Sequence, residues 1–166
     1  MQNPLMVHFS PSQISLLNRF AALSLLGALM LALRPYNGIR HDSILYFGQA
    51  LYSLYPDELS RDLFFEYGSQ ANFTIFPKLM AYFLTYFSAA HVSMAGIMFG
   101  FAFFLWSSCA LILRLVPRDY LLWALVFVLV WPASYGGFGI FKYQEPYLTA
   151  RSYTEPLVLL GLALLL

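Results

Sequence analysis

The amino-acid sequence predicts an all-α integral membrane protein, a multi-span helical bundle with juxtamembrane interfacial helices in its first outer loop. Three observations predict this class. Charged residues make up only 10% of the chain, against about 25% in a typical soluble domain. The mean hydropathy is +0.67. Apolar segments also recur along the chain, and two of them approach the roughly 20 residues that a helix needs to cross a bilayer.

The apolar segments define four expected spans of one polytopic membrane domain. They cover about residues 14–33, 93–113, 120–134 and 156–166. Arg34 and Pro35 close the first segment, because a proline interrupts a helix and a charged side chain avoids the bilayer. The fourth segment is incomplete at the last residue, since a span needs roughly 20 residues. We therefore expect residues 1–166 to be the N-terminal part of a longer membrane protein.

Two polar loops, at about 34–92 and 135–155, separate these spans, and their charges predict the topology. Five of the eight acidic residues lie in the first loop: Asp42, Asp57, Glu58, Asp62 and Glu66. The short turn at 114–119 holds two arginines and one aspartate. Short loops rich in Arg and Lys stay in the cytoplasm. We therefore expect a multi-pass protein, in the bacterial inner membrane, with its acidic loops facing the periplasm or the outside.

The apolar stretch at 75–90 decides whether both polar loops share one side of the membrane. If this stretch crossed the bilayer, the arginine-rich turn would face the same side as the acidic loop. The stretch is short and is bracketed by Pro77-Lys78 and His91. We therefore expect it to lie at the outer interface rather than to span.

The segment that follows the first span has helical periodicity. One expected face is polar, with residues at spacings of four, three and four: Asp42, Tyr46, Gln49 and Ser53. The opposite face is apolar and holds Ile44, Phe47, Leu51 and Leu54. Such a helix is expected to lie on the membrane with its polar face toward water. Two interpretations of Asp42 stay open: a helix N-cap, or a functional carboxylate.

The second loop is dense in side chains that bind anions or cations. These are Lys142, Glu145, Arg151 and Glu155. Arg151 and Glu155 are four residues apart, so a helix would place them on one face as an ion pair. The functional alternative is that Arg151 contacts a phosphate and that Glu145 or Glu155 helps to bind a divalent cation such as Mg²⁺ or Mn²⁺.

Several segments, taken in order, resemble the GT-C superfamily of membrane glycosyltransferases, of the mannosyltransferase and oligosaccharyltransferase type. They are "IRHDSILYFGQALY" after the first span, "TIFPKLMAYFLTYF", the inner turn "RLVPRD" and "TARSYTE" in the second loop. The resemblance implies transfer of a sugar from a polyprenyl-phosphate-linked donor to an acceptor at the outer membrane face. It implies that Asp42 acts as base or metal ligand and that Arg151 contacts the phosphate. Tyr46, Gln49 and Lys142 are the further candidates for substrate contacts.

Two other classes of protein remain as alternatives. A transporter would carry charges along a path through its spans, but the segments at 93–113 and 121–131 hold no charged residue. A non-catalytic membrane subunit would carry its loop charges only for contact with water. The net charge of +1 gives no argument for a nucleic-acid partner, so membrane lipids and a lipid-linked sugar donor are the expected partners.

Overall fold

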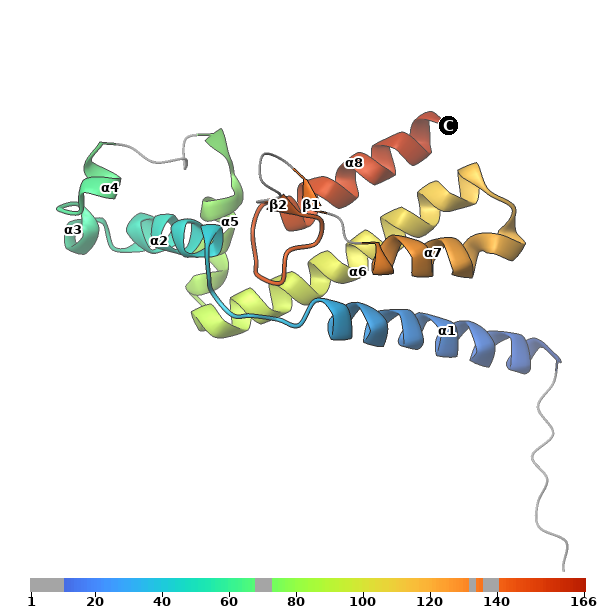
Figure 1. Cartoon of the computed structure of the whole chain (residues 1–166). Helices are drawn as coiled ribbons and strands as arrows, with labels where there is room; N and C mark the ends of the chain where they lie inside the picture. The colour runs from blue at the N-terminus through green and yellow to red at the C-terminus, as the bar shows by residue number, and fades with distance from the viewer. Residues whose placement is uncertain (1–10, 68–72, 132–133, 136–140) are drawn as a thin grey trace, which may run out of the picture.

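The computed structural model describes residues 11–67, 73–131, 134–135 and 141–166, and these are mostly helical (Figure 1). The helices form two groups. Four of them make a bundle: α1 (Pro11–Leu33), α6 (Ala89–Leu115), α7 (Leu121–Val130) and α8 (Arg151–Leu165). Four others gather beside the N-terminal end of α6: α2 (Asp42–Leu54), α3 (Pro56–Leu59), α4 (Leu63–Glu66) and α5 (Phe76–Leu84).

Each group has its own apolar core. In the bundle, Met30 of α1, Ile97 of α6 and Leu129 of α7 are at most 1% exposed. In the other group, Phe47 and Ala50 of α2 pack with Met80 of α5. Val92 of α6 also belongs to this second core, so α6 is the element that joins the two groups.

Local signals in the sequence set the ends of several elements. Ser88 is the N-cap of α6, and its hydroxyl accepts a hydrogen bond from the amide of His91 at 3.4 Å. Asp62 caps α4 in the same way by accepting from the amide of Phe64 at 2.8 Å. Pro117 separates α6 from a short 3-10 helix, Arg118–Tyr120, that leads into α7. Serine and aspartate are preferred caps because their oxygens satisfy amides that lack an intrahelical partner.

α6 is long and apolar enough to cross a membrane, and it is the one such helix in the described part of the chain. It contains the span expected at 93–113. α7 has only ten residues, which cover about 15 Å at the rise of 1.5 Å per residue. The helix is thus shorter than the span expected at 120–134. Likewise, α8 begins at Arg151 rather than at residue 156, so part of the predicted second loop is helical.

The stretch at 75–90 forms a nine-residue helix, α5, which ends before α6 begins. Nine residues cover about 13 Å, less than half of the hydrocarbon thickness of about 30 Å. The short length agrees with a helix that does not span. Its place at the membrane interface stays a prediction.

α2 begins at Asp42 and ends at Leu54, so the predicted helix is confirmed, but its predicted polar face is wrong at Gln49. This side chain, expected to face water, is 2% exposed. The physical reason is α5, which packs against α2 and buries the side that carries Phe47 and Ala50. The prediction considered α2 against a membrane surface and not against a second helix.

Two glycines let α8 approach α6 closely. A Cβ atom at Gly96 would lie 2.7 Å from a methyl group of Leu148, and one at Gly100 would lie 3.2 Å from the Cβ and the carbonyl oxygen of Ser152. The hydroxyl of Tyr153 donates to the carbonyl of Gly96 at 2.8 Å. Small residues spaced by four allow such close contact between apolar helices. The N-terminal turn of α8 is therefore fixed on α6.

Replacing Gly100 with valine is expected to destabilise the protein, because the branched side chain would press on the backbone of Ser152. Overpacking of this kind typically costs about 1–3 kcal/mol. The matched control is Gly161→Val in α8, where an added Cβ meets no atom within 4 Å. Thermal unfolding in detergent should show a lower midpoint for Gly100→Val than for Gly161→Val. Equal midpoints would contradict the close packing of α8 on α6.

Candidate functional site

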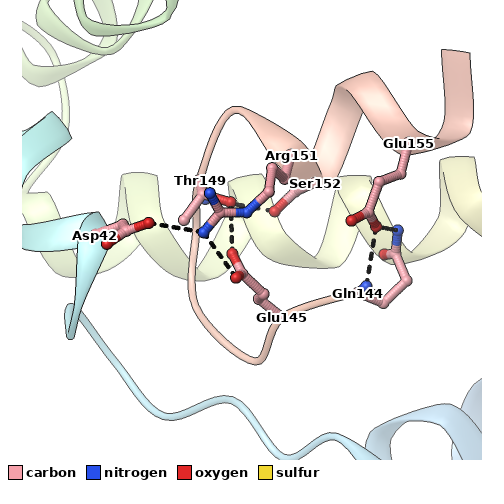
Figure 2. A network of polar contacts seen from close by, with 7 residues as sticks. All are labelled: Asp42, Gln144, Glu145, Thr149, Arg151, Ser152 and Glu155. Carbon is pink, nitrogen blue, oxygen red and sulfur yellow. Dashed lines mark hydrogen bonds and ion pairs between the residues drawn. The ribbon is translucent and has the colours of Figure 1, made fainter. Parts of the chain in front are cut away.

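Arg151, the first residue of α8, joins the two polar loops (Figure 2). Its Nη2 atom donates to Oδ2 of Asp42 at 2.7 Å and to Oε1 of Glu145 at 2.7 Å. Asp42 lies 109 positions before Arg151 in the chain and is the first residue of α2. One guanidinium thus binds a carboxylate from each loop.

Glu145 is the buried member of this cluster. Its side chain is 3% exposed, and its second oxygen, Oε2, accepts a hydrogen bond from the hydroxyl of Thr149 at 2.9 Å. Thr149 is itself fully buried. Both oxygens of the Glu145 carboxylate therefore have donors, which is the arrangement that makes a buried charge tolerable.

Asp42 does not act as an N-cap, so that interpretation is wrong. The N-cap of α2 is His41, which makes no side-chain capping bond, and the Asp42 carboxylate binds Arg151. His41 has a left-handed backbone with φ of 49°, and its ring lies against Tyr147 with centroids 5.3 Å apart. Gln144, the residue before Glu145, is also left-handed with φ of 53°. Such a backbone is uncommon for residues other than glycine, yet here one precedes each carboxylate.

Glu155 lies one turn along α8 from Arg151 and binds a different partner. Its Oε2 atom accepts from the backbone amide of Gln144 at 3.0 Å and from the Gln144 side chain at 3.3 Å. Figure 2 shows Glu145 below Arg151 and Glu155 to its right, beside Gln144 of the loop before α8. The second loop is thus fastened to α8 at Glu145 and at Gln144.

The three other residues predicted to contact substrate lie in different surroundings. Tyr46 is partly buried next to the cluster, and its ring meets Phe76 edge-on at 5.2 Å. Gln49 is buried, and neither atom of its amide has a hydrogen-bond partner among the described residues. Lys142 is exposed on β2 (Phe141–Lys142), which pairs with β1 (Ser134–Tyr135). The network drawn in Figure 2 includes neither Gln49 nor Lys142.

The electrostatics of the cluster favour a charged Arg151. Burial alone would lower the pKa of this guanidinium, but hydrogen bonds and charges from Glu145 and Asp42 outweigh it and raise the pKa above the ordinary value. The pKa of the Tyr46 phenol is raised, first by burial, then by the charges of Asp42 and Glu145 against that of Arg151. Tyr46 therefore stays a neutral hydrogen-bonding group beside the ion cluster.

Arg34 is a second cation near this site, and the sequence analysis assigned it only to the end of the first span. Its Nη1 atom donates to the carbonyl of Leu129 at 2.9 Å, in the last turn of α7, and its Nε atom donates to the carbonyl of Tyr143 at 3.4 Å. Burial lowers the pKa of Arg34, and the charge of Glu155 opposes that shift. An arginine directly after an apolar segment was the available signal in the sequence.

Arg34 and Arg151 both line a cavity of about 690 Å³ between α6, α7 and α8. Most of its wall is apolar, with Phe104 and Ile112 from α6 and Leu159 from α8. Tyr143 and Glu155 also line it. The cavity therefore combines an apolar interior with cationic groups, which suits a ligand that has a hydrocarbon chain and an anionic head.

A divalent cation has a limited set of candidate ligands. Among the described residues, no three His, Cys, Asp or Glu side chains lie close enough together to hold a metal ion. Two carboxylates, Asp42 and Glu145, do converge on one point, the Nη2 atom of Arg151. Mg²⁺ is commonly bound by one or two carboxylates together with substrate phosphates, but the charged guanidinium holds both carboxylates here, so a cation could bind Asp42 only after Asp42 leaves Arg151.

Comparisons with protein-family models, with curated proteins and with solved structures gave no match.

Removing Glu145 is expected to destabilise the protein more than removing Asp42. Glu145→Ala leaves a buried hydroxyl and part of the Arg151 charge without a partner, which we expect to cost about 2–3 kcal/mol. Asp42→Ala removes a half-exposed ion pair, worth about 1 kcal/mol or less. Glu58→Ala, at an exposed position of α3, is the control. The thermal unfolding midpoint should be lowest for Glu145→Ala, higher for Asp42→Ala and highest for Glu58→Ala. Equal midpoints for the variants at residues 42 and 145 would contradict the prediction.

Proposed function

We propose that this chain belongs to a membrane glycosyltransferase of the GT-C type, which transfers a sugar from a polyprenyl-phosphate-linked donor to an acceptor at the outer membrane face. The observation that carries the proposal is the position of Arg151. It binds Asp42 and Glu145 at 2.7 Å each and also lines an apolar cavity. The resemblance of the sequence to GT-C enzymes supports the same function.

The residues present match the demands of the reaction. The acceptor must lose a proton as it attacks the sugar, and a positioned carboxylate serves as general base. Asp42 takes this role, because its side chain is 46% exposed and therefore accessible. The departing lipid phosphate needs positive charge, which Arg151 and Arg34 supply. A divalent cation, where one takes part, would neutralise charge on the phosphate and would take Asp42 as a ligand in place of Arg151.

The donor's hydrocarbon chain fits the cavity between α6, α7 and α8. Its wall includes Phe127 and Val128 of α7 and Val158 of α8. An apolar chain in this cavity would place its phosphate at the arginines, because the alternative buries an anion among hydrocarbon groups. A donor carried by a lipid would reach this cavity from the bilayer.

The proposed enzyme is a multi-pass protein whose two polar loops share the outer side of the membrane. α1 and α8 would then be membrane helices beside α6. α7 is too short to span as a helix alone, so it would return the chain to the outer side together with the residues next to it. The direct contact between Asp42 and Arg151 supports this arrangement, because two residues in contact must lie on one side. The inner turn would be the one that carries Arg114 and Arg118.

Asp42→Asn in the full-length protein is expected to lower glycan transfer by about 100-fold or more, the usual contribution of a general base. The amide cannot accept the proton but keeps the size of the side chain. Transfer is measured as radiolabelled sugar moved from polyprenyl-phosphate donors to membrane and cell-surface acceptors. Asp57→Asn, an exposed acid of α3, is the control. Full activity of Asp42→Asn would remove Asp42 from the mechanism, and uptake of a solute without transfer would favour a transporter.

The topology is tested by single cysteines in a Cys109→Ser background. Exposed positions 57, 118 and 142 each receive one cysteine. A membrane-impermeant thiol reagent added to intact cells should label residues 57 and 142, because both lie in the polar loops. Residue 118 should react only after the membrane is opened. Labelling of residue 118 from the outside would contradict the multi-pass arrangement.

A further inference from the structure

We infer that the Asp42 carboxylate occupies the place of the donor's phosphate on Arg151, and that donor binding displaces Asp42 while Glu145 stays bound. The inference rests on the proposed function and names the event that would begin the reaction. Three features of the cluster support it: the unequal burial of the two carboxylates, the balance of charge, and the position of Arg151 on the cavity.

The two partners of Arg151 differ in how firmly they are held. Glu145 is 3% exposed, whereas Asp42 is 46% exposed. Glu145 also binds Thr149 through its second oxygen. Moving Glu145 away would strand a buried charge, which is costly. Moving Asp42 away only transfers a half-exposed carboxylate to water, and exposed ion pairs are weak. Asp42 is thus the partner that can be exchanged.

The charge of the cluster requires an exchange of this kind. Two arginines, Arg34 and Arg151, are close enough to Glu155, Asp42 and Glu145 to interact with them electrostatically. These five groups sum to one negative charge. A phosphate adds at least one more, and like charges in a partly buried site repel strongly. Release of Asp42 from the guanidinium lets the phosphate take a charge-assisted contact that already has the right geometry.

The position of Arg151 on the cavity wall shows how a donor phosphate could reach the ion cluster. Arg151 belongs both to the ion cluster and to the wall of the apolar cavity. A phosphate carried by a chain in the cavity would therefore reach the Arg151 guanidinium, whose Nη2 atom is the donor that Asp42 now holds. Once displaced, the half-exposed Asp42 carboxylate turns toward water, where it is free to meet the acceptor. The donor would thus bind before Asp42 can act as base.

Binding of farnesyl phosphate to the full-length protein in detergent tests the exchange, with EDTA present and calorimetry as the readout. Asp42→Asn and Asp42→Ser both remove the competing charge, and we expect each to bind the probe about three- to tenfold more tightly than the wild type. Asp57→Asn removes an exposed charge elsewhere and should bind as the wild type does. Arg151→Gln should lose most of the affinity. Unfolding midpoints confirm that each variant is folded.

The outcomes separate the inference from the proposed function. Unchanged or weaker binding by folded Asp42→Asn and Asp42→Ser would overturn the exchange, although the lipid-phosphate site would stand. A requirement for Mg²⁺ that disappears with Asp42 would also overturn it, because Asp42 would then hold a cation. Equal affinity for farnesol and farnesyl phosphate, or no binding in any variant, would overturn the proposed function and the inference together.

Discussion

The guanidinium of Arg151 is the contact on which the arrangement of the polar part of this protein depends. It ties the first residue of α2 to the first residue of α8 and to the loop before α8. Because each helix also packs elsewhere, α2 on α5 and α8 on α6, this side chain adds a polar connection to the apolar one that Val92 of α6 makes between the two groups of helices. An arginine suits the position, since its planar head can donate to several acceptors and stays charged when partly buried.

Two residues next to this contact have an unfavourable backbone conformation. His41 and Gln144 both have positive φ, a conformation that costs a residue other than glycine about 1 kcal/mol or more. Each immediately precedes one of the two carboxylates that bind Arg151. The turn at His41 directs α2 so that Asp42 meets the second loop, and the turn at Gln144 brings Glu145 beneath the guanidinium. Strain is compensated here by ion pairing and by the fully buried Thr149.

Local patterns in the sequence predicted individual helices, but they did not predict most contacts between helices. The spacing from Asp42 gave the start and the end of α2, and the charge distribution placed Asp42 and Arg151 on one side before their contact was known. The polar face of α2 was predicted wrongly at Gln49, which is buried, because the pattern of a single helix does not show which elements pack against it. The length of α7 and the start of α8 also differed, because hydropathy does not locate helix ends. Contacts such as Arg34 with the carbonyl of Leu129 depend on helices far apart in sequence, and no local pattern encodes them.

In the proposed membrane setting, the glycines of α6 would link the ion cluster to the thickness of the bilayer. α6 has 27 residues and is thus about 40 Å long, longer than a hydrocarbon core of about 30 Å, so such a helix tilts to bury its apolar length. α8 rests directly on Gly96 and Gly100, so Arg151 would follow that tilt, whereas Asp42 is carried by α2 and α5. Lipids with longer or shorter chains would then shift the two halves of the cluster relative to each other. Acyl-chain length thereby becomes a physical variable of this site, alongside its charges and its hydrogen bonds.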